Sequence, residues 1–162
     1  TAKYGFVVGM YYRQPIKQLK NNHLQFDLRA AFRGSAFNNP GDDHYRKINL
    51  FYLDAPLMDY IQLGQSGKHF AIVGVQYSQL INSLVFIHPV GTRPISEGIG
   101  LKNFDISALA GYHFTGYYAG LSIVYTNGLI DINSGLNLPN VLPQTGNNKP
   151  IRNSSISLLV YF

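Results

Sequence analysis

The stretch HLQFDLRAAFR, residues 23–33, has the clearest alternation of apolar and polar side chains in the chain. A period of two is the pattern of a β-strand, whose successive side chains point to opposite faces. One face takes Leu24, Phe26, Leu28, Ala30 and Phe32, and the other takes Gln25, Asp27, Arg29, Ala31 and Arg33. All the charge lies on one face, so the fold depends on what the apolar face contacts.

The composition is poor in charge. The 162 residues suit a single domain, residues 1–162, in which 46% of the residues are hydrophobic and only 13% are charged. Soluble domains carry about 25% charged residues, so this chain cannot easily cover itself with solvated side chains. No apolar run approaches the roughly 18 residues that would indicate a transmembrane helix. If a membrane is involved, strands must cross it.

Strand patterns fill most of the remaining sequence. We expect strands over residues 3–13, 45–63, 69–79 with a less regular continuation over 80–87, 102–114, 117–127 and 151–162, which makes seven with residues 23–33. Each is about long enough for the 9 to 11 residues with which a tilted strand crosses a bilayer. Pro56 predicts a bulge or a local break in the ladder of its strand, because proline donates no hydrogen bond.

The connections between these strands alternate in length. Residues 14–22, 64–68 and 115–116 are short, whereas residues 34–44, 80–101 and 128–150 are longer. Outer-membrane barrels have short periplasmic turns, long extracellular loops and aromatic girdles near the strand ends. The sequence therefore predicts an antiparallel up-and-down transmembrane β-barrel in the bacterial outer membrane, with its C-terminus in the periplasm and its long loops outside the cell.

Several segments carry a family resemblance. In order they are GFVVGMYYRQPI, HLQFDLRAAFRG, INLFYLDAPLMDYIQL, GYHFTGYYAGLSIVYTNGLIDI and RNSSISLLVYF. Together they resemble the small outer-membrane β-barrel proteins of Bacteroidota, a porin-like group that includes PorT-like proteins, and YLDAPL at residues 52–57 is similar to the YLEIPL strand of that group. Leu158, Val160 and Phe162 also resemble the C-terminal signal by which outer-membrane barrels are recognised for assembly.

The strand count raises a question of parity. If Phe162 is periplasmic and each of seven strands crosses once, Thr1 lies outside the cell, whereas single-chain bacterial barrels have an even number of strands. We therefore expect eight strands, with an N-terminal strand preceding Thr1. The alternative is that residues 45–63 or 69–87 fold back as two strands.

The polar face of the strands predicts the barrel interior. The cluster expected there comprises Asp27, Arg29, Arg33, Asp105 and His113. Buried charges must be paired, so Asp27 and Asp105 are expected to meet Arg29 or Arg33 across the interior. A structural plug of ion pairs is the simpler interpretation, and a proton path, an ion path or a catalytic group is the alternative.

Basic residues gather toward the predicted outer rim. The set consists of Arg46, Lys47, Lys102, Lys149 and Arg152. They could bind lipopolysaccharide phosphates or a partner protein through charge-assisted hydrogen bonds, and the alternative is ordinary solvation of loops. The positive charges form no stripe, so we expect no binding to nucleic acid.

The sequence contains no enzyme signature. The five histidines lack ligand spacing, Asp42, Asp43 and His44 read as a solvated loop, and no GxSxG, Walker or HExxH motif occurs. We therefore expect no catalytic, metal or cofactor site, although a hydrolase or acyltransferase assembled from loops at the outer rim is an alternative.

Three classes of function remain. The resemblance to PorT-like proteins, which are secretion components, implies a non-enzymatic structural or accessory subunit of a larger outer-membrane complex, for example a secretion or transport machine. The second class is a stand-alone barrel for transport, adhesion or ligand binding through its loops. The third is a soluble barrel of lipocalin type, in which the apolar face would point inward and the charged face would meet water.

Overall fold

All regular structure in the described part of the protein is β-strand. The computed structural model describes residues 5–17, 19, 21–37, 45–88, 91–94, 102–132 and 152–162. The strands are β1 (Phe6–Pro15), β2 (Asn22–Phe37), β3 (Tyr45–Gln62), β4 (His69–His88), β5 (Gly91–Pro94), β6 (Phe104–Thr115), β7 (Gly120–Gly128) and β8 (Ser154–Tyr161). Within these ranges, no helix is long and apolar enough to cross a membrane.

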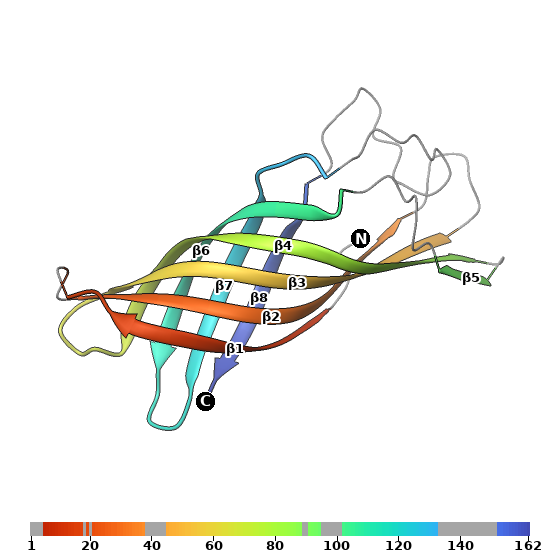
Figure 1. Ribbon diagram of the computed structural model, residues 1–162. Coiled ribbons are helices and arrows are strands. Elements are labelled where there is room, and N and C mark those ends of the chain that lie inside the picture. The colour runs from red at the N-terminus through yellow and green to blue at the C-terminus, as the bar shows by residue number, and fades with distance from the viewer. Residues whose placement is uncertain are drawn as a thin grey trace.

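Seven of the strands form one curled antiparallel sheet, a half-barrel, in the order β1-β2-β3-β4-β6-β7-β8 (Figure 1). The short strand β5 pairs with the end of β4. β1 and β8 are the two edges, and among the described residues they do not pair with each other. Because the seven strands alternate in direction, β1 and β8 run the same way. The predicted antiparallel all-β fold is confirmed at this level.

Three tight connections gather at one end of the sheet, here called the short-turn end (Figure 1). They are residues 16–21, 63–68 and 116–119. Gly64 and Gly67 have φ angles of 73° and 65°, a left-handed conformation that glycine adopts without strain. β2, β4 and β7 end at the opposite end of the sheet, here called the long-connection end, and more residues separate each of them from the next strand of the seven-strand order. The predicted alternation of short and long connections is therefore present.

Strand boundaries differ from the predicted ones in three places. Residues 45–63 and 69–87 form single strands, β3 and β4, so the alternative in which one of them folds back is wrong. The turn predicted at residues 115–116 spans 116–119, where Gly116 N donates to Ala119 O at 2.9 Å, and β7 begins only at Gly120. The last strand begins at Ser154.

Pro56 interrupts the ladder on one side of β3. The β2–β3 register has Phe26 opposite Leu57 and next Arg29 opposite Asp54, with no pair opposite Pro56 between them. Toward β4, Pro56 stays in register with Gln76, and the irregularity lies at Phe51 and Tyr52. The predicted local break is confirmed on the side of β2, as expected of a residue that has no N–H to donate.

The sheet is apolar on its outer, convex face and largely polar on its inner, concave face. On β2, Phe26 is 48% exposed whereas its neighbour Gln25 is 0% exposed, and the alternation continues along the strand. The same order holds on β7, where Leu121 and Ile123 are exposed and Ser122 is buried. The lipocalin arrangement, with apolar side chains inside and charges outside, is therefore wrong for this chain.

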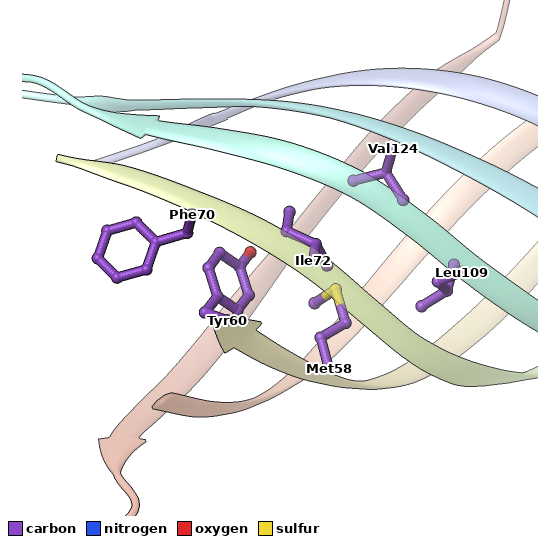
Figure 2. Packing of buried hydrophobic residues seen from close by; sticks show 6 residues of the cluster. All are labelled: Met58, Tyr60, Phe70, Ile72, Leu109 and Val124. Atoms are coloured by element: carbon purple, nitrogen blue, oxygen red, sulfur yellow. The ribbon is translucent and has the colours of Figure 1, made fainter. Parts of the chain in front are cut away.

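An apolar cluster occupies part of the interior. It consists of Met58, Tyr60, Phe70, Ile72, Leu109 and Val124, and Figure 2 shows these side chains close to one another. The alternation had indicated a mainly polar inner face and did not reveal this cluster. The cluster joins the inner faces of four neighbouring strands, β3, β4, β6 and β7.

Candidate functional site

A chain of polar contacts crosses the interior near the short-turn end. Arg13 Nε donates to Gln25 Oε1 at 2.6 Å, and Gln25 Nε2 donates to Asp27 Oδ1 at 2.7 Å. Arg29 Nε donates to Asp27 Oδ2 at 2.8 Å, and Arg29 Nη2 donates to Tyr161 Oη at 2.9 Å. These residues lie on β1, β2 and β8, so the contacts connect the two edges of the sheet through its interior.

A second set of contacts lies nearer the long-connection end. Arg33 forms an ion pair with Asp54, and its guanidinium carbon lies 5.2 Å from the centre of the Tyr52 ring. Asn153 Nδ2 donates to Tyr52 Oη at 3.2 Å and to Asp105 Oδ2 at 3.0 Å. This set ties β2, β3 and β6 to the residue that precedes β8.

The pairing of the interior charges differs in part from the prediction. Asp27 does pair with Arg29, but the two lie two residues apart on β2 and not across the interior. Arg33 pairs with Asp54, which the predicted cluster did not include. Asp105 is fully buried, and its contacts in the described part of the chain are to Asn153 and Ser107, so its expected pairing with an arginine is wrong.

Asp54 was missed because its strand has a weak pattern. Counting in twos from Tyr52 leads through Asp54, Pro56, Met58 and Tyr60, all of which are buried. This inner face mixes aromatic, acidic and aliphatic side chains, so alternation alone does not distinguish it from the outer face. The signal that could have identified Asp54 is its spacing from Tyr60: the two residues are separated by an even number of positions along β3, so their side chains point to the same face.

His113 lies on the inner face at the short-turn end, as its predicted place in the cluster requires. Its Nδ1 is 2.7 Å from Ser122 Oγ, and its Nε2 is 3.1 Å from Thr115 Oγ1. A Cβ atom on Gly120 would lie only 2.5 Å from His113 Cε1. The ring therefore packs against the backbone of β7 at a position where only glycine leaves room.

A cavity of about 210 Å³ adjoins this histidine at the short-turn end. Its walls come from β1, β6, β8 and the turn at residues 116–119, and they include Tyr11, Arg13, His113, Thr115 and Tyr161. Tyr117 and Tyr118, in that turn, also line it and are highly exposed, so the cavity reaches the surface of the protein.

The residues predicted at the outer rim are placed only in part. Lys47, Lys102 and Arg152 are exposed, and they lie toward the long-connection end. The side chains of Arg46 and Lys149 lie outside the described residues, as do Asp42, Asp43 and His44. At the other end of β8, Leu158, Val160 and Phe162 are exposed on the outer face.

No metal centre is indicated in the described ranges, where no group of three His, Cys, Asp or Glu side chains is placed to hold an ion. Comparison with known proteins adds no assignment: no protein-family description, no curated protein and no solved structure matches this chain.

Proposed function

We propose that this protein is an integral β-barrel of the bacterial outer membrane that serves, without enzymatic activity, as a structural or accessory subunit of a larger outer-membrane complex. The observation that carries the proposal is the distribution of side chains, with apolar residues on the outside of the sheet and charges inside. Met10 on β1 is 72% exposed, whereas Asp27 on β2 is 1% exposed. Monomeric soluble proteins rarely expose contiguous apolar patches larger than a few hundred Å².

The outer face of the sheet is apolar on every strand whose side chains are described, and this supports the proposal that it faces lipid. Large hydrophobic side chains are exposed on every strand whose side chains are described, including Val75 on β4, Ile106 on β6 and Ile156 on β8. In lipid this face satisfies the requirement that a spanning strand turn its apolar residues outward. The short-turn end then faces the periplasm, and the long-connection end faces the outside of the cell, where Lys102 and Arg152 can meet lipopolysaccharide phosphates.

The proposed barrel has eight strands: the seven of the curled sheet and one more, which lies between β1 and β8 and runs antiparallel to both. The unpaired edges support this closure, because exposed strand edges are a liability that closed barrels remove. Both faces of β1 are largely exposed, and Ser157 on the inner face of β8 is only half-buried, whereas Ser107 and Ser122 on central strands are fully buried. A strand in this seam would cover the inner face there.

The filled interior supports an accessory role over that of a diffusion pore. An eight-stranded barrel has an interior just wide enough for side chains to fill it. Here the apolar cluster of Figure 2 and two sets of polar contacts occupy that interior. A barrel whose lumen is filled acts by binding other proteins at its surface and not by letting solutes pass through it. The resemblance to PorT-like proteins points to a larger outer-membrane protein as the partner.

Two measurements test the two parts of the proposal. Carbonate washing of isolated membranes should leave the protein in the pellet, and its release into the soluble fraction would contradict the membrane assignment. The protein is then purified in a maltoside detergent without crosslinker, beside an unrelated tagged barrel from the same cells as the control. Stoichiometric co-purification of a larger outer-membrane protein with this chain alone is expected, and a monomeric barrel would contradict the accessory role.

A further inference from the structure

Polar side chains bound the apolar outer face of the sheet near the short-turn end. Asn22 on β2 lies beside Asp59 on β3, and its Nδ2 donates to Asp59 Oδ2 at 2.9 Å. Farther round the sheet, His69 Nδ1 on β4 contacts Tyr112 Oη on β6. Asp59 is only half-buried, and a carboxylate is far more costly in hydrocarbon than in water. We call these four residues the short-turn line.

A second row of polar groups crosses the same face toward the long-connection end. Tyr77 Oη donates to Gln79 Oε1 at 2.6 Å, and Gln79 Nε2 donates to the backbone oxygen of Asn103 at 2.8 Å. Asn82 pairs with Phe51 and is exposed on the same face. The polar residues of this row, here called the long-connection line, are Asn49, Gln79, Asn82 and Asn103.

Between the two lines the outer face is apolar. Its outward residues are Phe51, Leu53, Ala55 and Leu57 on β3, and Phe104, Ile106, Ala108 and Ala110 on β6. Beyond the long-connection line the two faces of β3 exchange their character, because Lys47 is exposed on the outside and Ile48 is 5% exposed on the inside. On β3 the apolar outer surface therefore ends at this line, although β3 reaches Tyr45 and β4 continues to His88, where β5 joins it (Figure 1).

The spacing of the two lines gives the height of the apolar belt. Asn49 and Asp59 are ten residues apart on β3, and Asn103 and Tyr112 are nine residues apart along β6. At about 3.3 Å per residue and a tilt of about 40°, these spacings correspond to a height of about 23–25 Å. A typical bilayer has a hydrocarbon core of about 30 Å, and the bacterial outer membrane is thinner than average. The belt matches the thinner membrane.

We propose that the two lines mark the limits of the hydrocarbon around this part of the sheet, and that the protein fits a bilayer whose apolar core is about 25 Å thick. The inference rests on the proposed membrane location and adds the depth of insertion to it. Tyr77 and Tyr112 support it, because each exposes its ring on the belt and directs its hydroxyl to a polar partner at one line, as tyrosine does at a membrane surface. The ends of β3 and β4 beyond the long-connection line, together with β5, then stand outside the hydrocarbon.

The test is a measurement of depth on the full chain in lipid vesicles. Single cysteines replace Asn49, Leu53, Ala55 and Asp59 on β3 and carry bimane, whose fluorescence bromine and iodide quench. Lipid brominated near the end of its acyl chains should quench the labels at positions 53 and 55 strongly, and most of this quenching should be lost at positions 49 and 59. Aqueous iodide should quench in the opposite order. Labels at positions 75 and 82 of β4 should show the same contrast, so the test does not depend on the folding of any one β3 variant.

Two arginine variants of β6 supply a second readout. A108R places the charge near the middle of the belt and should lower the urea midpoint in vesicles, whereas N103R, the matched variant at the long-connection line, should leave it unchanged, because the cost of arginine falls toward zero at the interface. Equal midpoints of A108R and N103R, or acyl-chain bromine that quenches positions 49 and 59 as strongly as position 53, would overturn the proposed limits and leave the membrane location standing. Iodide that reaches every label, with no quenching by brominated lipid, would overturn both.

Discussion

Replacing Asp27 by asparagine should destabilise the protein strongly. Asp27 is 1% exposed and accepts hydrogen bonds from Gln25, Arg29 and Tyr161. The substitution keeps the size of the side chain but removes the negative charge that pairs with Arg29 in the described part of the chain, and Arg29 is itself buried. Removing one partner of a buried ion pair costs about 3–5 kcal/mol, because the other charge is left uncompensated.

The assay is urea unfolding of the protein folded into lipid vesicles, followed by far-UV circular dichroism. The double variant D27N/R29M should recover most of the lost stability, since replacing both members of a buried pair by neutral groups is often close to neutral. K102A, which changes an exposed side chain, should stay within about 0.5 kcal/mol of the original protein. A cost of D27N below about 1 kcal/mol, or a double variant as unstable as the single one, would refute the reasoning.

Three further predictions follow from the same structure. V75R places a charge in the middle of the outer face of β4 and should cost about 2–4 kcal/mol in vesicles, as arginine does near the bilayer centre, so an unchanged urea midpoint would contradict a lipid-facing β4. G120A puts a Cβ 2.5 Å from His113 Cε1, so it should displace that ring and cost about 1–3 kcal/mol by thermal unfolding; a chemical shift of the His113 ring that stays unchanged would argue against this packing. If an eighth strand closes the barrel, the edge amides of β1 and β8 in the membrane-embedded protein should exchange their hydrogens as slowly as those of β6, and rapid exchange at both edges would indicate an open seam.

The outer face was predictable from the sequence because it is the regular one. On β1, β2, β6 and β7 nearly every second residue is apolar and exposed, and this regularity is visible in the sequence as alternation, for example at Phe26 and Ile123. A period of two is a local property of one strand. It therefore identifies strands and their two faces without any knowledge of their neighbours.

The interior was harder to predict because its contacts join different strands. Whether Arg33 meets Asp54 or Asp105 depends on the register and on the curl of the sheet, which no single strand encodes. The inner apolar cluster also escaped, because Ile72 and Val73 make both faces of β4 apolar at that level. The strand predicted from residue 117 began too early, because Tyr117 and Tyr118 continue the alternating pattern although they lie in a turn. Alternation contains no information about the hydrogen bond from Gly116 N to Ala119 O that closes this turn.

The most direct test of the membrane barrel is an accessibility scan along β7. The chain has no cysteine, so single cysteines can be introduced at residues 121–125 and spin-labelled without background. In lipid vesicles, labels at Leu121, Ile123 and Tyr125 should be relaxed by oxygen, which dissolves in the lipid phase, whereas labels at Ser122 and Val124 should be protected from it. If water-soluble relaxants reach the three outward positions and lipid-dissolved oxygen does not, the outer face meets water and the membrane assignment is wrong.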